Sequence, residues 1–282
     1  MQSVEHREHT TTMKTAEEKL HQLKKVLQEM GAVAVAYSGG ADSTLLLRVC
    51  AGVLKDRVLA VTAVSPIFPS VEISEAVRLA GWLSVSHLTV ETAQLEDTQF
   101  VANSPERCYH CKLKMYGELK RMASERDIGQ LVDGSNLDDL GDYRPGTRAA
   151  AELGIRRPLE EVRLTKEEIR ALSREMGLPT WNRPSTACLA SRFPYGIPIT
   201  GEALAAVEQA EAFLRGLGIG QLRVRHHGNM ARIEVEPGDM RLLLDGPDRG
   251  RIVARFKELG YVHVALDLEG YRTGSLNEGL RL

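Results

Sequence analysis

The residues that most directly suggest chemistry lie in the stretch SGGADST at 38–44. It follows the apolar run AVAVAY and precedes a helical pattern, so it joins a buried strand to a helix. Two glycines let the backbone approach a ligand closely, and a helix N-terminus presents unpaired N–H groups to an anion. Ser38 and Ser43 add hydroxyl donors. The stretch predicts a phosphate-binding loop, although Gly-Gly alone could make a tight strand-to-helix turn.

Four cysteines offer a second kind of chemistry. Cys50 lies on an apolar helical pattern, and we expect it in the core. Cys108 and Cys111 form RCYHC, and Cys188 stands alone in PSTACLASRFPYG at 184–196. The spacing of Cys108 and Cys111 is compatible with a pair of core cysteines, with a redox pair or with a metal site. Zinc and iron–sulfur cubanes usually take four protein ligands, so three cysteines would leave one iron of a cubane open to an exogenous ligand.

Arginines offer candidate phosphate ligands. Arg223 and Arg225 occupy alternate positions of a predicted strand, which places them on one face, and Arg144 follows an acidic loop. Guanidinium groups bind phosphate bidentately, so we expect these three residues to bind a substrate phosphate. A solvated strand face is the alternative for Arg223 and Arg225.

These residues need a scaffold, and the hydrophobic pattern indicates one. Apolar runs at 32–37, 57–64 and 86–90 alternate with helical patterns, which predicts an α/β fold with a parallel sheet and helices on both faces. Ligands bind such sheets outside the carboxyl ends of the strands. From about residue 200 a helix, a hairpin around Gly-Asn, a helix and a strand indicate a small C-terminal α+β domain. We expect a flexible tail at 1–14 and domains at 15–195 and 196–282.

Composition excludes several classes of protein. With 36 basic and 38 acidic residues the formal charge is −2, so we expect neither a nucleic-acid nor a membrane partner. No apolar run approaches the ~20 residues that span a bilayer, and the N-terminal segment lacks a signal-peptide pattern. Four cysteines make no dense disulfide framework, which predicts a cytoplasmic protein.

The phosphate-binding stretch resembles the PP-loop of the ATP-pyrophosphatase superfamily, whose fold is adenine nucleotide alpha hydrolase-like. With RCYHCK, DGSNLDDLGDYRPG, PSTACLASRFPYG and GYRTGS, the chain resembles the LarE-type ATP-dependent sulfur transferases over nearly everything after the tail. The resemblance implies that ATP and Mg²⁺ bind at Ser38, Gly39, Gly40, Asp42 and Ser43. It also implies release of pyrophosphate, conversion of ring carboxylates of a pyridinium mononucleotide to thiocarboxylates for the nickel-pincer nucleotide, and a homo-oligomer.

The same resemblance makes Cys188 the sulfur-bearing residue. In one form of the family this cysteine gives up its own sulfur and becomes dehydroalanine. In another form three cysteines hold a 4Fe–4S cluster. Because this chain has Cys108, Cys111 and Cys188, we favour the cluster. A PP-loop enzyme of tRNA thiolation and a non-catalytic nucleotide or metal sensor are the alternative functions.

Overall fold

The structure is a computed structural model, and it describes residues 15–141, 145–184, 186–272 and 274–275. Four parallel strands form the central sheet in the order β3-β2-β1-β4, with Val33 of β1 paired to Val58 of β2 and Gln130 of β4. The strands are β1 (Val33–Ala36), β2 (Val58–Val64), β3 (Ser86–Glu91) and β4 (Gln130–Val132). The predicted α/β fold class with a parallel sheet is confirmed.

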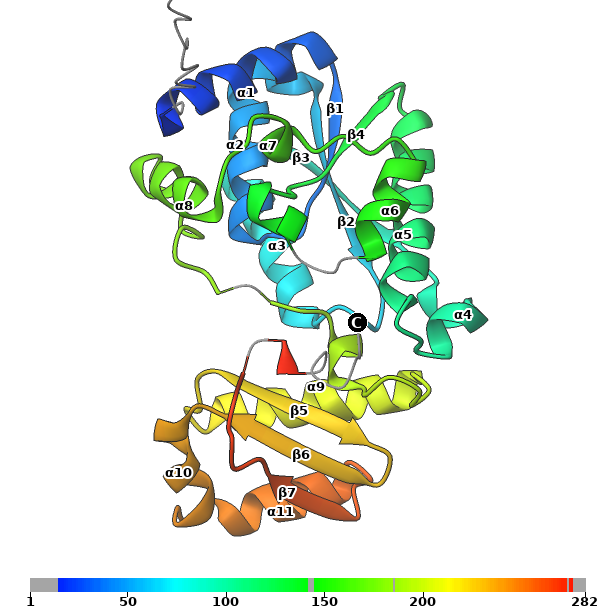
Figure 1. The fold of residues 1–282 in the computed structure, drawn as a ribbon, viewed down its shortest axis with the longest axis vertical. Coiled ribbons are helices and arrows are strands. Elements are labelled where there is room, and N and C mark those ends of the chain that lie inside the picture. The colour runs from blue at the N-terminus through cyan, green and yellow to red at the C-terminus, as the bar shows by residue number, and fades with distance from the viewer. Residues whose placement is uncertain (1–14, 142–144, 185, 273, 276–282) are drawn as a thin grey trace, which may run out of the picture.

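Helices cover both faces of this sheet (Figure 1). On one face lie α5 and α6, and on the other α1, α2, α3 and α8. Their bounds, with those of the short helices, are α1 (Ala16–Met30), α2 (Ala41–Leu54), α3 (Ser70–Trp82), α4 (Thr98–Val101), α5 (Arg107–Ser124), α6 (Pro145–Glu152), α7 (Pro158–Glu161) and α8 (Lys166–Glu175).

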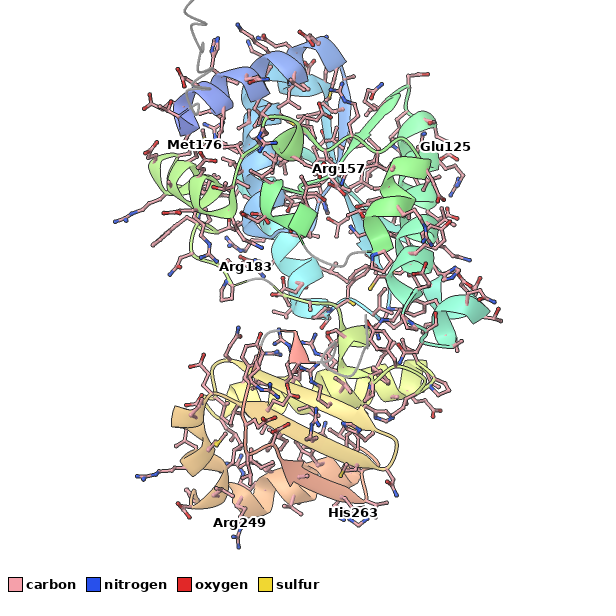
Figure 2. All side chains as sticks on the ribbon, viewed as in Figure 1. Glu125, Arg157, Met176, Arg183, Arg249 and His263 are labelled. Carbon is pink, nitrogen blue, oxygen red and sulfur yellow. The ribbon has the colours of Figure 1, made fainter. Side chains whose placement is uncertain are left out.

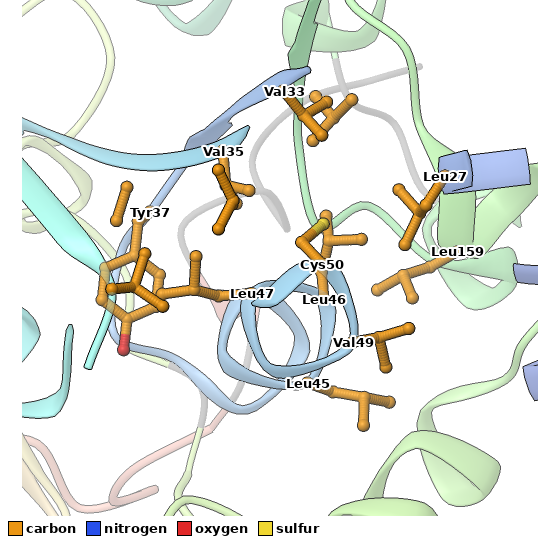
Figure 3. Close-up of a cluster of buried hydrophobic side chains, with 14 of the residues drawn as sticks. Leu27, Val33, Val35, Tyr37, Leu45, Leu46, Leu47, Val49, Cys50 and Leu159 are labelled. Atoms are coloured by element: carbon orange, nitrogen blue, oxygen red, sulfur yellow. The ribbon is translucent and has the colours of Figure 1, made fainter. Parts of the chain in front are cut away.

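The sequence of β1 explains why the core has two sides. Val33 and Val35 point into the cluster around α2, whereas Ala34 packs on the side of α5. Alternate residues of a strand face opposite sides, so a continuous apolar run suits a strand that is covered on both. Cys50 lies in the α2 cluster with no exposed surface, among the leucines and valines of Figure 3. The prediction that Cys50 is a core residue is confirmed.

Helix α5 begins earlier than the pattern indicated. The sequence pattern after the cysteine pair predicts a helix over about 112–126, but the first residue of α5 is Arg107. The Arg107 guanidinium donates to Oδ1 of Asn103 at 2.6 Å and to the carbonyl of Ala190 at 2.9 Å, and these contacts stabilise the first turn. Cys108 and Cys111 therefore lie on the helix, three residues apart and on one face.

A second, smaller sheet has the order β5-β6-β7, in which β5 and β6 are antiparallel and β6 and β7 are parallel. Its apolar face packs against α9 and α11. The elements are α9 (Gly201–Gly216), β5 (Leu222–His227), β6 (Met230–Val235), α10 (Met240–Leu244), α11 (Arg249–Glu258) and β7 (His263–Leu266). The predicted α+β unit with its hairpin is confirmed. The expected tail at 1–14 lies outside the described residues, and the domain boundary at 195/196 stays a prediction.

Helix α9 contacts both units. Leu204 and Val207 pack with Ile67 and Phe100 of the first unit, while Ala210 and Leu214 belong to the core of the second. Within the described residues, no helix has both the length and the apolar composition that crossing a membrane requires.

Candidate active site

A cavity of about 400 Å³ opens at the carboxyl ends of β1, β2 and β4, where the fold predicts a ligand. Its walls include loop residues 38 and 40–43, the start of α3, one face of α5 and residues 183, 184 and 186–188. Cys188 therefore lines the same cavity as Ser38, Asp42 and Ser43. The cavity has the size of a small-molecule site.

The loop at the start of α2 has the geometry of an anion site. Gly39 has φ +71°, and a Cβ there would lie 3.0 Å from the Cα of Ala76, so a larger residue would not fit. Gly40 is the N-cap residue of α2 and has no side chain over the helix N-terminus. The hydroxyls of Ser38 and Ser43 lie 3.1 Å apart beside it. A phosphate group would meet backbone N–H groups and two hydroxyls here.

Asp42 supplies a carboxylate that suits a divalent cation. Among the described residues its Oδ1 is buried without a hydrogen-bond partner, while its Oδ2 accepts from Nδ2 of Asn136 at 3.3 Å. Burial raises the pKa of Asp42, although the positive charge of Lys166 opposes this. Mg²⁺ is usually held by one or two carboxylates together with substrate phosphates. The orphaned oxygen fits such an ion, with the nearby Asp139 as a second carboxylate that lines the cavity.

The remaining walls of the cavity suit the phosphates and the base of a nucleotide. Lys112, Lys166, Arg170 and Arg183 line the cavity and offer positive charge to phosphates. The wall at the level of β1 and β2 is mostly apolar, with Ala36, Val61 and Ala63 beside Thr62, and α5 adds Met115 and Leu119 to it. An apolar slot beside a group of cations is what a purine and its phosphates require.

A buried hydrogen-bond chain runs along α5 into the cavity. Nζ of Lys112 donates to Oη of Tyr116 at 2.6 Å, and Tyr116 in turn donates to Oδ2 of Asp133. Burial disfavours the charge on Lys112, but the interactions with Tyr116 and Asp133 outweigh it and raise the pKa of Lys112. Burial is also the main cause of the raised pKa of Tyr116. Lys112 is therefore a cation and Tyr116 a neutral donor.

The three cysteines of interest lie near one another. Cys111 and Cys188 pack against the same apolar cluster, and both Cys108 and Cys111 interact electrostatically with Cys188. Burial raises the pKa of the Cys108 and Cys111 thiols, and the Cys188 thiol raises both further. Among the described residues no three His, Cys, Asp or Glu side chains are placed so that they could hold a metal ion as they stand. The donor chemistry nevertheless suits an iron–sulfur cluster, because all three side chains offer sulfur.

Two arginines fix the segment that carries Cys188. Arg183 donates to the carbonyl of Gly39 at 3.2 Å and to Glu72 at 2.8 Å, which joins this segment to the phosphate-binding loop. Figure 2 shows Arg183 where the chain leaves the first unit. Arg192 donates to the carbonyls of Ala187 and Cys188 at 2.7 and 2.9 Å. Cys188 is thus anchored on both sides.

Arg223 and Arg225 lie on one face of β5, as predicted, but that face is not solvated. Arg223 is 7% exposed and Arg225 5%. Arg225 pairs with Glu234 at 2.7 Å and donates to the carbonyl of Ser191 at 2.7 Å. Arg223 has no carboxylate partner among the described residues, and burial lowers its pKa. Arg144 lies outside the described residues.

Comparison with known proteins gives the family. No family model matches the chain. An uncharacterized protein of Synechocystis is 42% identical over 264 residues, which cover 94% of this chain and 98% of that protein. A protein of Lactiplantibacillus plantarum named pyridinium-3,5-bisthiocarboxylic acid mononucleotide synthase is 37% identical over 272 residues, which cover 95% of this chain and 97% of that protein. The chain belongs to the LarE-type sulfur transferase family. An uncharacterized protein of Methanocaldococcus jannaschii is 30% identical over 90% of this chain and 98% of its own length.

In this LarE-type chain the cavity brings together the loop residues and Cys188 that the motifs singled out. The cavity is also lined by side chains to which the sequence analysis gave no role, chiefly Tyr116, Asp133 and Glu72. Asp133 comes directly after β4, and this position at the carboxyl end of a parallel strand was the available signal. Tyr116 and Glu72 carry no such signal, since helix residues face a cavity only through tertiary packing.

Proposed function

We propose that this protein is an ATP-dependent sulfur transferase that converts ring carboxylates of a pyridinium mononucleotide to thiocarboxylates. One observation carries the proposal: Cys188 and the phosphate-binding loop line a single cavity. A carboxylate that ATP has activated at the loop would meet a thiol without leaving the site. Membership of a family that includes a pyridinium-3,5-bisthiocarboxylic acid mononucleotide synthase supports the choice of substrate.

In the first step the loop around Ser38, Gly39, Gly40 and Ser43 would bind the β- and γ-phosphates. Asp42 would hold Mg²⁺, which neutralises phosphate charge when bound. A carboxylate oxygen of the substrate forms a bond to the α-phosphorus, and the bond from that phosphorus to the bridging oxygen breaks. Its electron pair leaves with pyrophosphate, and the product is an acyl-adenylate.

In the second step sulfur displaces AMP. If Cys188 is the donor, its thiolate attacks the acyl carbon, and AMP leaves with the bonding electron pair. Loss of the Cα proton and cleavage of the Cβ–S bond then give dehydroalanine and the thiocarboxylate. If Cys108, Cys111 and Cys188 hold a 4Fe–4S cluster, the cluster supplies a sulfide sulfur and the chain stays intact. We favour the cluster because the chain has all three cysteines, and Cys188 lies close enough to Cys108 and Cys111 to interact electrostatically with both thiols.

The substrate phosphate would bind near Arg223 and Arg225, and we keep Arg144, which lies outside the described residues, as a third candidate. Arg223 supports this because it is a buried cation without a carboxylate partner among the described residues. A buried unpaired charge is unfavourable, and a phosphate dianion would compensate it. Arg225 reaches the carbonyl of Ser191, three residues beyond Cys188, so the phosphate site would adjoin the sulfur-bearing segment.

The test is an anaerobic reaction with MgATP and the carboxylated pyridinium mononucleotide. Pyrophosphate, AMP and thiocarboxylate are counted per chain, and the mass of the intact protein is measured afterwards. We expect equal amounts of AMP and thiocarboxylate, with several sulfurs per chain when iron and sulfide are supplied, and an unchanged mass. Cys50→Ala is the matched control, because its thiol is in the core and away from the cavity.

Each other outcome has a definite meaning. At most one sulfur per chain, with the loss of one H₂S from Cys188, would assign the sulfur to this residue. ATP binding without substrate-dependent pyrophosphate would indicate a sensor. Turnover that depends on tRNA rather than on the mononucleotide would make the protein a tRNA-thiolation enzyme.

A further inference from the structure

Lys112 is one of the cavity cations to which the proposed steps above assign no role. It lies on α5 directly after Cys111, and it lines the cavity with Met115 and Leu119 of the same helix. The apolar wall formed with Met115 and Leu119 suits a purine, and the loop at 38–43 suits the β- and γ-phosphates. Lys112 lines the same cavity as both of these parts, and it lies within electrostatic range of Cys111, so it can reach a phosphate of a nucleotide bound there.

The position of the Lys112 ammonium group is defined by its neighbours. Nζ donates to Oη of Tyr116 at 2.6 Å and lies 4.8 Å from the centre of the Tyr116 ring. Tyr116 donates to Asp133, whose other carboxylate oxygen accepts from the backbone N–H of Ser135 at 2.9 Å. A side chain with three donors is thus fixed through one of them, and the others remain for a ligand in the cavity.

The stem of Lys112 is confined as well. Gly146 of α6 is buried, and a Cβ there would lie 2.9 Å from Cγ of Lys112. Only glycine lets α6 lie this close, so packing restricts the rotamers of the lysine. A cation held in place before the ligand arrives needs little reorganisation when charge develops beside it.

We infer that Lys112 binds the α-phosphate of the nucleotide, with Tyr116 and Asp133 as its positioning residues. The binding of the α-phosphate by Lys112 does not depend on the proposed function. Only its catalytic role does, namely the stabilisation of charge on the α-phosphoryl oxygens during adenylation. The contact itself persists in the AMP complex. No proton moves in this role, because Lys112 acts as a fixed positive charge.

Binding of AMP and of adenosine tests the inference without any turnover, since only AMP has the phosphate. Isothermal titration of the full chain should show that the wild type binds AMP more tightly than adenosine. We expect Lys112→Met to weaken AMP binding about tenfold or more and to leave adenosine binding unchanged. Lys112→Arg should retain part of the preference, and Tyr116→Phe should lose part of it. Lys114→Met is the matched control on the same helix, because Lys114 does not line the cavity.

Unchanged AMP binding in Lys112→Met would overturn the inference, as would a wild type that does not distinguish AMP from adenosine. Adenosine binding also serves as the control for folding of each variant. If Lys112→Met binds neither AMP nor adenosine, Tyr116→Phe decides the question. A weaker preference of this variant for AMP over adenosine would support the inference, and an unchanged preference would overturn it. A wild type that shows the AMP effect but forms no thiocarboxylate would overturn the proposed function and leave the assignment of Lys112 intact.

Discussion

At the scale of single residues, Asp42 has a buried carboxylate oxygen, Oδ1, that still lacks a partner among the described residues. Burial also raises the pKa of Asp42. We expect Asp42→Asn to weaken MgATP binding roughly tenfold (about 1.4 kcal/mol), because the variant loses a charged Mg²⁺ ligand. In excess EDTA the same substitution should not weaken ATP binding, since a negative charge near phosphates is removed. Titration with ATP under both conditions checks this, and equal weakening with and without Mg²⁺ would contradict it.

Single residues also show where prediction from sequence ends. The phosphate-binding loop was predictable because its glycines and hydroxyls are contiguous in the chain. The alternation of Arg223 and Arg225 placed both on one face, but their burial involves residues that are distant in sequence or on another strand. Arg225 contacts Ser191 and Glu234, and Arg223 lies over the ring of Tyr271. The chain of hydrogen bonds from Lys112 to Asp133 spans two elements and leaves no local pattern.

At the scale of elements, Arg183 is the link between the phosphate-binding loop and the segment that carries Cys188. It bonds to the carbonyl of Gly39 and to Glu72, and Thr186 donates to the same Glu72 at 3.2 Å. We expect Arg183→Gln to increase amide exchange both in the loop and in residues 186–188, because both lose one shared contact. Hydrogen–deuterium exchange measures this directly.

The matched control for this exchange experiment is Arg174→Gln. Arg174 lies over the ring of Trp181 at 5.2 Å and does not line the cavity. We expect amide exchange in the phosphate-binding loop of the Arg174→Gln variant to equal that of the wild type. Faster exchange in only one of the two segments of Arg183→Gln would show that Arg183 does not couple them.

The elements themselves were largely predictable, and their exceptions have local causes. Capping boxes at Thr15 and Thr165 mark the starts of α1 and α8 in the sequence. The start of α5 carries no such signal, because the contacts of Arg107 with Asn103 and Ala190 stabilise it. The partner Ala190 is more than 80 residues away, so the cysteine pair fell on a helix that local pattern did not predict.

At the scale of the whole molecule, a buried ion pair joins the two units. Arg192 donates to Glu211 of α9 at 2.8 and 3.0 Å, and the two side chains are 0% and 1% exposed. Burial acts to raise the pKa of Glu211, but the hydrogen bond and the charge of Arg192 outweigh it and hold the pKa below its usual value. Glu211 therefore stabilises the fold above its unfolded-state pKa of about 4.3, and this contribution disappears as the pH falls through the lower folded-state pKa.

We expect Glu211→Gln to lower the free energy of unfolding at pH 7 by about 3 kcal/mol, because Arg192 is left without its charged partner. The difference from the wild type should shrink as the pH falls below about 4, where Glu211 itself becomes protonated. Urea denaturation at several pH values measures both effects. Glu202→Gln on the exposed start of the same helix is the control, with an expected change below about 1 kcal/mol. A difference that widens on acidification would contradict the assignment.

The carboxylate of Glu211 also has a consequence for self-association. Its Oε1 accepts from the backbone N–H of Val224 at 3.1 Å, and β5 is one of the two edge strands of the small sheet. An edge strand with open amides is a template for an added strand from another chain. Glu211 occupies one of these amides, so a foreign strand cannot continue the ladder past Val224 without displacing it. The residue that joins the two units thereby also opposes the addition of a strand at Val224 of β5.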